Sequence, residues 1–493
     1  MRIGIDFGTS YSAAGAVVNG ELQLIRFGAD QQFRTTVFFP QRLPDLSEFE
    51  LTDAMFDEIQ KLVGEFRRDQ SRLHAQLRAR REEALKRPEP QRTAELGMIP
   101  SPRVRGDAEL ERDARALVRR RWAAEEMRKA MLEGVDLQRA LYGEEAVDAF
   151  IDGSAGQLVV SPKSMLGYKL ESRARDTLLG IATHLLRHIR LTASEQLGSE
   201  VRAAILGRPV RFRSSMKEAG GVQALEILTD AAYAAGFDEV EFLEEPAAAA
   251  YGYHAQTQRP RRTLILDIGG GTTDMALADV GGAGAAPVVH DSWGEPVGGT
   301  DVDIELSMRG VMPLFGKGVT STPVHRYYEA SAVQDLQRQA RFRETSFEHV
   351  QAPYGERLET LKGAGHTVRL NRVVERAKIS LSDVHHVTLE LDFIEAGLCA
   401  PIDAAGLSDA ARPFLYQLRT LMERARDELE APPETIYLTG GMSRSPYVPL
   451  LAKEIFPDAE LVAGNASLGV VTGLAHAAAG QGIVRRKMLQ QNP

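Results

Sequence analysis

Two segments of this chain repeat one design at a distance of 261 residues. They are Ile3-Gly4-Ile5-Asp6-Phe7-Gly8-Thr9-Ser10-Tyr11-Ser12 and Leu264-Ile265-Leu266-Asp267-Ile268-Gly269-Gly270-Gly271-Thr272-Thr273-Asp274. In each, an apolar run ends in Asp and is followed by a glycine-bearing turn, hydroxyl residues and more apolar residues, which predicts a buried strand, a tight turn and a returning strand. Converging N–H groups and hydroxyls suit phosphate oxygens, and a strand-end carboxylate suits hydrated Mg²⁺. The pair of turns therefore predicts a nucleotide triphosphate held from both sides.

The composition places the chain among soluble globular proteins. Its 493 residues allow more than one domain, and 43% hydrophobic with 26% charged residues is ordinary for this class. The net charge of −9 argues against general nucleic-acid binding, and a single cysteine, Cys399, leaves no internal disulfide. No apolar run approaches the ~20 residues of a membrane span, and the first strand begins too near Met1 for a signal peptide. We therefore expect a cytoplasmic protein without membrane or nucleic-acid partners.

A charged segment interrupts the regular pattern of strands after Pro40. Residues 65–130 hold 18 Lys and Arg against 12 Asp and Glu. Apolar residues recur there at helical spacing, at Phe56, Ile59, Leu62 and Phe66 and again at Leu110, Ala114 and Leu117. Prolines at 88, 90, 100 and 102 separate the two patterns, so we expect two long charged helices around an irregular loop. We interpret the arginine-rich face as solvated surface in preference to a patch for an anionic partner.

Alternation of strands and helices resumes at Gln157–Val160 and continues to the last predicted helix, Ser467–Ala479. The polar run Arg259–Arg262 directly precedes the second hairpin and marks the boundary between two lobes. We expect lobe I at 1–258, with the helical insertion at about 45–140, and lobe II at 259–466. Residues 467–493 are expected to form a helix that returns towards lobe I and a basic tail.

Five motifs in sequence order resemble the actin-like ATPase fold and, within it, the nucleotide-binding domain of the Hsp70 family. The pair of hairpins is the first of these motifs. The other four are Glu244-Glu245-Pro246-Ala247-Ala248-Ala249-Ala250-Tyr251-Gly252, Gly298-Gly299-Thr300-Asp301, Glu375-Arg376-Ala377-Lys378-Ile379-Ser380-Leu381-Ser382 and Thr439-Gly440-Gly441-Met442-Ser443-Arg444-Ser445-Pro446. The resemblance covers residues 1–40 and roughly 157–480. It implies an α/β, two-lobed actin-like ATPase (RNase H-like) fold with a helical insertion in the first lobe.

The resemblance also implies an ATP or ADP site with Mg²⁺. In that site Asp6 and Asp267 would hold the metal through water, Glu245 would orient the attacking water, and Thr272 would complete the catalytic group. The nucleotide would be bound by Gly8, Thr9, Ser10, Tyr11, Gly269, Gly270, Gly271, Thr273, Gly298, Gly299, Glu375, Lys378, Ser382, Gly440, Gly441, Met442 and Arg444. Simpler interpretations remain open: strand-end Asp residues cap turns, hydroxyls suit β structure, an acid suits a helix start, and Glu375 with Lys378 suits a surface ion pair. Glu244 matches no role, and we expect it to be solvated.

Departures from the family pattern bear on hydrolysis. Val147 stands where we align the catalytic lysine, and Lys163 matches a different family position. Ile379 replaces an arginine that faces the adenine, and Ser467 replaces an aspartate of the adenosine loop. Pro493 follows soon after the last nucleotide-domain helix, so we expect no substrate-binding domain, which resembles the YegD-like Hsp70 homologues.

The leading hypothesis is an ATP-binding, slowly hydrolysing Hsp70-like chaperone whose lobes close on Mg-ATP and act on a protein partner through the insertion. Val147 and Ile379 support a second hypothesis, a nucleotide-binding scaffold without catalysis. An actin-fold small-molecule kinase also opens with an Asp-x-Gly-Thr hairpin, although the Gly-Gly-Gly-Thr-Thr-Asp and Glu-Arg-Ala-Lys motifs favour the Hsp70 type. A polymerising actin-like filament is the last alternative.

Overall fold

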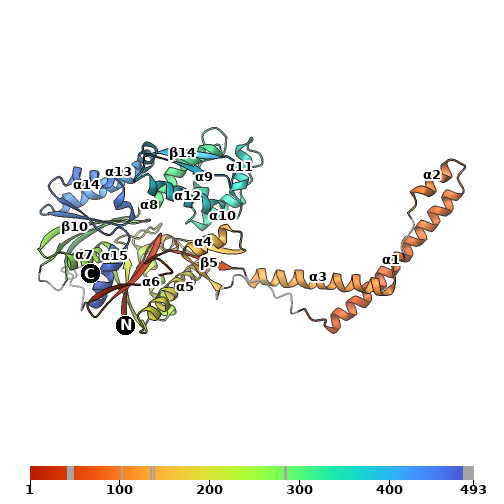
Figure 1. Cartoon of the computed structure of the whole chain (residues 1–493), viewed down its shortest axis with the longest axis horizontal. Helices are drawn as coiled ribbons and strands as arrows, with labels where there is room; N and C mark the ends of the chain where they lie inside the picture. The colour runs from red at the N-terminus through yellow and green to blue at the C-terminus, as the bar shows by residue number, and fades with distance from the viewer. Residues whose placement is uncertain (42–48, 101–103, 134–135, 137–138, 283–285, 481–493) are drawn as a thin grey trace. The chain divides into compact units, whose positions relative to one another are not determined.

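The structure is a computed structural model that describes residues 1–41, 49–100, 104–133, 136, 139–282 and 286–480 (Figure 1). The predicted basic tail at 485–487 lies outside these residues. The chain divides into two compact units, a larger one of Met1–Phe39 with Arg139–Pro493 and a smaller one of Pro40–Gln138. Among the helices of the described ranges, none has the length and apolarity that a membrane crossing requires.

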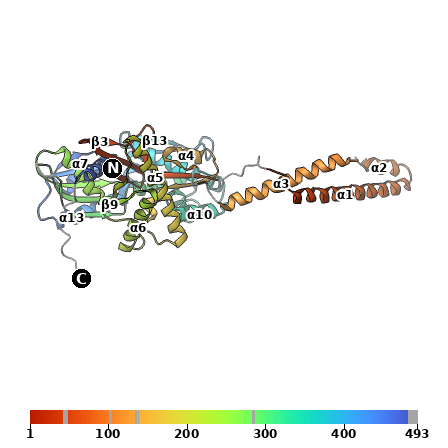
Figure 2. The same ribbon diagram turned by 90° about the horizontal axis from the view of Figure 1, so that it is seen from below.

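The smaller unit is a helical hairpin. Its helices are α1 (Asp53–Leu85), α2 (Gln91–Met98) and α3 (Asp107–Glu133), and α1 and α3 run side by side (Figure 2). Thr52 caps α1, because its side chain accepts a hydrogen bond from the Met55 backbone N–H. The ion pairs Arg121–Glu58 and Arg67–Asp107 fix the helices as antiparallel. The hairpin has its own core, made of Ile59, Leu62, Val63, Leu110, Ala114 and Val118.

The helix α2 corrects one prediction. We expected an irregular loop between the long helices because of its prolines, yet Gln91–Met98 is helical. Pro90 directly precedes this helix, at a position where a missing backbone N–H costs nothing. The prolines therefore bound a short helix as well as interrupting the long pattern.

The first sheet of the larger unit contains the first predicted hairpin. Its strands have the order β3-β2-β1-β8-β9, with β4 also paired to β2. β1 pairs antiparallel with β2 and parallel with β8. The bounds are β1 (Arg2–Phe7), β2 (Tyr11–Val18), β3 (Glu21–Leu24), β4 (Phe33–Arg34), β8 (Ala203–Arg208) and β9 (Glu239–Glu244).

The second sheet repeats this arrangement with the second hairpin. Its order is β12-β11-β10-β15-β16, and β10 again pairs antiparallel with the next strand and parallel with β15. The bounds are β10 (Arg261–Ile268), β11 (Thr273–Val280), β12 (Val288–Glu295), β15 (Thr435–Thr439) and β16 (Glu460–Ala463). The equal strand order of the two sheets confirms the predicted α/β fold with duplicated hairpins.

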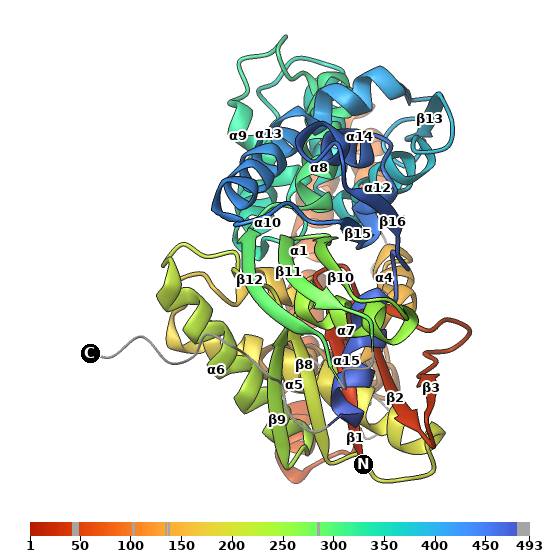
Figure 3. The ribbon, with the colours of Figure 1, turned by 90° about the vertical axis from the view of Figure 1, so that its left-hand side faces the viewer.

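Two helices, α7 (Glu245–Gln256) and α15 (Gly469–Ala479), lie side by side between the two sheets (Figure 3). α15 packs against β1, β2 and β8, and α7 packs against β10 and β11. The close approach depends on glycine, because a Cβ on Gly473 would lie 1.6 Å from the Ala248 carbonyl oxygen. These two helices therefore bring the two phosphate turns to the same region of the molecule.

Smaller elements complete each side of the larger unit. Beside the first sheet lie β5 (Thr36–Pro40), β6 (Leu141–Tyr142), α4 (Gly143–Ile151), β7 (Gly156–Val160), the 3₁₀ turn Pro162–Met165, α5 (Ser172–Gln196) and α6 (Glu218–Ala235). Beside the second lie α8 (Gly299–Leu306), the turns Ser307–Val311 and Met312–Phe315, α9 (Val324–Ser331), α10 (Leu336–Glu344), α11 (Tyr354–Leu361), α12 (His366–Ser380), β13 (His386–Glu390), β14 (Cys399–Asp403), α13 (Ala404–Glu428), the turn Gly441–Arg444 and α14 (Tyr447–Ile455). One large apolar core joins these helices to β10, β11 and β15.

Candidate functional site

A cavity of about 460 Å³ lies where the two hairpin turns meet. Its walls combine residues that are far apart in the sequence. They include Asp6, Gly8, Thr9, Ser10, Tyr11, Lys163, Glu245, Asp267, Gly269, Gly270, Gly271, Thr272, Gly299, Glu375, Lys378, Ser382, Gly440, Gly441, Met442 and Arg444. The structure thus brings together nearly all of the residues that the sequence assigned to a nucleotide site.

The two predicted phosphate turns touch each other directly. The second turn is closed by a hydrogen bond of 2.9 Å from the Gly269 N–H to the Thr272 carbonyl oxygen. A Cβ on Gly270 would lie 2.1 Å from Ser10 Oγ, and one on Gly271 would lie 2.7 Å from Thr9 Oγ1. Only glycine permits this approach, which places hydroxyls of one turn against backbone of the other.

A buried ion pair occupies the centre of the site. Lys163 Nζ donates to Glu245 Oε1 at 2.5 Å, and the two residues are only 6% and 7% exposed. Lys163 lies in the 3₁₀ turn Pro162–Met165 that follows β7, and Glu245 begins α7 directly after β9. Asp6 at the end of β1 and Asp267 near the end of β10 line the same cavity.

The carboxyl groups around this pair are crowded. Burial raises the pKa of Asp6 to about 7, with Glu245 adding to the rise and Lys163 opposing it. Burial and Glu245 likewise raise the pKa of Asp267 well above its ordinary value. Burial would lower the pKa of Lys163, but Glu245 and Asp6 outweigh it and raise that pKa. The site therefore holds its lysine charged and favours additional positive charge.

Asp274, on β11, adds to this demand for a cation. Its Oδ1 accepts from the Val210 N–H at 2.7 Å, whereas its buried Oδ2 has no partner within the described residues. Burial, followed by Glu245, raises the pKa of Asp274 to about 8. Hard carboxylate oxygens of this kind fit Mg²⁺. The described residues contain no cluster of three or more His, Cys, Asp or Glu that could hold a metal directly.

The predicted nucleoside side of the cavity is already engaged in ion pairs. Glu375 Oε2 accepts from Arg34 at 2.8 Å, and the Lys378 ammonium pairs with buried Asp303 at 2.8 Å. Lys378 also donates to the Gly299 carbonyl oxygen. Burial raises the pKa of Asp303 to about 6, and Lys378 opposes that rise. Glu375, Lys378 and Ser382 all line the cavity, although Ser382 follows the end of α12.

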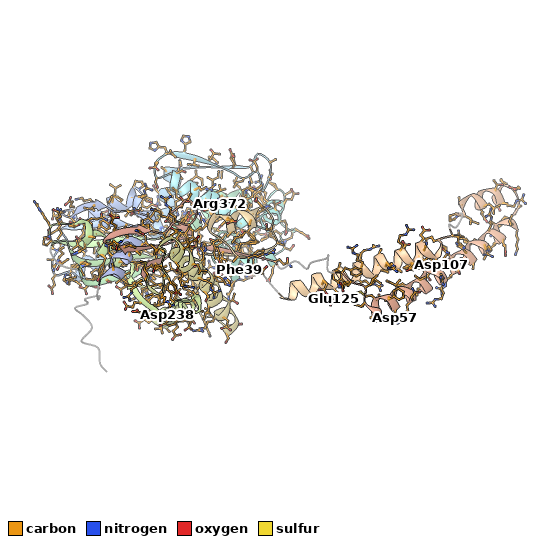
Figure 4. All side chains as sticks on the ribbon, turned by 60° about the horizontal axis from the view of Figure 1, so that its bottom comes forward. Phe39, Asp57, Asp107, Glu125, Asp238 and Arg372 are labelled. Carbon is orange, nitrogen blue, oxygen red and sulfur yellow. The ribbon has the colours of Figure 1, made fainter. Side chains whose placement is uncertain are left out.

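Ion pairs also cross from the first-sheet side to α12 above the cavity. Arg372, labelled in Figure 4, donates to Asp148 of α4 at 2.6 Å and pairs with Glu144 at 2.7 Å. Glu144 also accepts from Arg34 Nε at 2.9 Å. We call Arg34, Glu144, Asp148, Arg372 and Glu375 the ion-pair bridge. No local sequence signal predicts these contacts, because their partners lie between 110 and 341 residues apart.

Two of the predicted binding residues lie outside the cavity wall. The Thr273 side chain is fully buried and donates to the Val297 carbonyl oxygen at 2.8 Å. Gly298 packs against the backbone of Gly269 and Gly270 and supports the second turn from behind. Both residues therefore shape the turn instead of facing the cavity.

The structure does not bring position 147, where we aligned the catalytic lysine, to the cavity. Val147 lies inside α4, is 2% exposed and does not line the cavity, whereas Lys163 does. The expectation that Glu244 is solvated is wrong. Glu244 is 8% exposed and accepts from Arg208 at 2.7 Å, because it is the last residue of β9, where that strand becomes buried. Ile379 and Ser467, the other departures, do line the cavity.

Comparison with known proteins gives a consistent family. A family model described as Hsp70 protein matches residues 177–340. A chaperone protein DnaK from Thermosipho africanus is 26% identical over 366 residues, which is 70% of this chain and 53% of that protein. An iron-sulfur cluster biogenesis chaperone from Saccharomyces cerevisiae mitochondria is 26% identical over 282 residues, 56% of this chain and 36% of that protein. The chain spans about half the length, or less, of these relatives. These matches support a nucleotide-binding domain of the Hsp70 type in this chain.

Proposed function

We propose that the chain is a slow, Mg²⁺-dependent ATPase of the Hsp70 type, in which lobe closure on ATP controls a protein partner. The observation that carries this proposal is the buried Lys163–Glu245 pair at the junction of the two phosphate turns. A charged lysine and a carboxylate within one cavity supply the two groups that γ-phosphate cleavage requires, a cation for the phosphate and an acceptor for water. The chaperone names of the relatives support a chaperone role.

The residues would divide the work by their positions. A γ-phosphate oxygen would replace Glu245 as the partner of Lys163, which frees Glu245 to orient the attacking water. N–H groups of Gly270 and Gly271 and the Thr9 hydroxyl would bind phosphate oxygens. Asp6 and Asp267 would hold Mg²⁺ through water, and the bound metal would offset the charge that develops on phosphoryl transfer. The raised pKa of both carboxyls supports a site built for added positive charge.

The protein partner is proposed to contact the insertion at about 45–140. This unit has a hydrophobic core of its own, so its apolar residues do not depend on the nucleotide domain for burial. It also carries an excess of arginine. A partner surface separate from the nucleotide cavity is what control by lobe closure requires.

Two measurements test the proposal. Mg-ATP at about 100 times Kd should stabilise the protein by about 2.7 kcal/mol, and absence of any thermal shift would contradict nucleotide binding. Single-turnover loss of the γ-phosphate should be much faster than in an Asp6→Ala, Asp267→Ala double variant. Equal rates would contradict hydrolysis.

A nucleotide-binding scaffold is the second candidate. The observations that favour it lie on the nucleoside side, where Glu375 and Lys378 already have protein partners and an apolar Ile379 lines the wall. Such a site could retain nucleotide without turnover. The same single-turnover assay separates the two candidates, because a scaffold gives stabilisation by ATP without loss of phosphate.

A further inference from the structure

A second cavity, of about 770 Å³, adjoins the nucleotide cavity in the larger unit. The two cavities share Tyr11, Gln32 and Ser467 in their walls. The rest of the second wall comes from the segment around β4, from β6 and α4, and from α5. The proposed ATPase reaction leaves this cavity without a role.

Aromatic residues line part of the second cavity. Phe27 and Phe33 lie with ring centroids 4.7 Å apart, and Tyr142 stacks on His188 at 4.2 Å with planes 5° apart. His188 also meets Phe33 edge-on at 5.4 Å, so the four rings are contiguous. Phenyl and phenol rings attract cations that lie over their faces within about 6 Å.

Carboxylates also line the second cavity. Asp30, Glu144 and Glu145 line the cavity, and Arg34 is the sole lysine or arginine among its described lining residues. Arg34 is neutralised by Glu144 and Glu375, at 2.9 and 2.8 Å. Burial lowers the pKa of His188, which favours the neutral form of its imidazole. The walls therefore combine aromatic residues with three carboxylates, of which Glu144 is paired with Arg34 and Arg372.

Glu144 connects the second cavity to closure of the first. It accepts from Arg34 and pairs with Arg372, which reaches it from α12. Arg34 in turn holds Glu375 in the wall of the nucleotide cavity. A competing cation at Glu144 would weaken two contacts of the ion-pair bridge at once.

We propose that this second cavity binds an organic cation with an apolar body, and that its binding loosens the ion-pair bridge and accelerates nucleotide release. The ammonium, amidinium or guanidinium head would lie against the ring faces and pair with Glu144 and Glu145, while the apolar body packs on Phe27 and Phe33. This chemistry is shared by small amphipathic amines and by a lysine or arginine side chain of a partner protein. The proposal rests on the nucleotide site proposed above.

The test measures dissociation of a fluorescent ADP analogue from the full chain. Benzamidine is the small cationic probe, and a capped Arg-Phe dipeptide is the side-chain probe. Benzyl alcohol and NaCl at equal ionic strength are the controls for the apolar body and for charge screening. We expect a cationic probe to accelerate release about three- to tenfold, the range for loss of one or two partly exposed ion pairs, with no effect of the controls.

Variants assign the effect to this cavity. Tyr142→Leu and Glu145→Gln should each abolish at least most of the acceleration, measured as the ratio of rates with and without probe. Tyr168→Leu, a variant at an exposed tyrosine outside the cavity wall, should retain it. Cooperative thermal unfolding of each variant establishes that it is folded.

The outcomes separate this inference from the proposed function. Acceleration by the dipeptide alone assigns the site to a partner side chain, and acceleration by benzamidine assigns it to small cations as well. If ADP binds but neither probe gives heat of binding or accelerates ADP release, the second site is overturned. The ATPase proposal then still stands. An equal effect in Tyr142→Leu also overturns it. Failure of ADP to bind refutes the proposed function and the link to release, while calorimetry with benzamidine still decides whether the cavity binds cations.

Discussion

Replacement of Lys163 by methionine should strongly slow ATP hydrolysis while sparing most nucleotide affinity. Methionine retains the unbranched shape of the lysine stem and removes the charge that pairs with Glu245. The lysine cation stabilises the phosphate most strongly in the transition state, when charge develops during phosphoryl transfer. The backbone of both turns contributes to binding of the nucleotide in the ground state. The variant therefore separates chemistry from binding.

The magnitude follows from the burial of the pair. Loss of one preorganised donor of this kind costs about 10²- to 10³-fold in rate. Glu245 would remain 7% exposed without its partner. Removal of one member of a buried ion pair destabilises by about 3–5 kcal/mol, so the variant should also unfold at lower temperature. Glu245→Gln combined with Lys163→Met should recover part of that stability, because the unpaired charge is then gone.

The assay is single-turnover loss of the γ-phosphate, with nucleotide affinity measured separately by calorimetry. Lys362→Met is the matched control, since Lys362 pairs with Glu359 outside the cavity. Val147→Lys, combined with Lys163→Met, should not restore the rate, because position 147 faces the interior of the first-sheet side. A rate within threefold of wild type in Lys163→Met would refute the assignment of Lys163 as the phosphate cation.

Three further predictions concern pH, closure and packing. The ligand-free protein should lose thermal stability from pH 6 to pH 8: the pKa values of Asp6 and Asp274 are raised to about 7 and about 8, so the folded state keeps protons that the unfolded chain has released and loses this advantage as pH rises. Asp274→Asn should flatten that slope in thermal melts. Arg372→Ala removes two contacts of the ion-pair bridge and should accelerate ADP release about five- to thirtyfold in stopped-flow fluorescence. Gly473→Ala should destabilise the protein by more than about 3 kcal/mol in denaturant titrations, because its Cβ would overlap the Ala248 carbonyl oxygen.

Matched variants make these three results specific. Arg412→Ala removes an exposed ion pair with Asp409 and should leave ADP release unchanged. Gly64→Ala has open space around its Cβ on α1 and should stabilise by up to about 1 kcal/mol. A pH slope that Asp274→Asn leaves intact, a normal release rate in Arg372→Ala, or wild-type stability in Gly473→Ala would each contradict the corresponding reasoning.

Much of the fold could be predicted because its signals are local. A strand that ends in Asp and a glycine-bearing turn determine their own geometry, and the repeat of this unit implies two equivalent sheets. The helix pattern of the insertion likewise follows from Ile59, Leu62, Leu110 and Ala114, which form the hairpin core. Helix α2 was missed because several prolines lie close together in this segment. Their spacing alone does not show which of them interrupts a helix and which precedes one.

The residues that the sequence misplaced depend on contacts between distant segments. Lys163 is carried into the cavity by the 3₁₀ turn after β7, and Ser161 begins that turn in the left-handed region at φ 52°. Position along the chain pointed instead to Val147, which lies inside α4 and does not line the cavity. The sequence signal for Lys163 was a lysine between a predicted strand and a predicted helix. Many lysines have such a position, so only the structure shows that this one enters the cavity. Arg34 carried no signal, since its partner Glu375 is 341 residues away.

The balance of charge explains why this site should couple ligand binding to closure. Asp6, Asp267, Asp274 and Glu245 surround one lysine, and the pKa of each of the three aspartates is raised by burial. The folded protein therefore carries an electrostatic cost that a bound cation relieves, and the relief is available only when groups from both sheets lie together. Mg²⁺ alone would relieve this electrostatic cost only partly. Phosphates alone would occupy Lys163 and leave the carboxylates crowded against one another. A nucleotide and metal together satisfy both sides, so closure should be favoured by the pair far more than by either component, which titration of closure with Mg²⁺, ATP and both would measure.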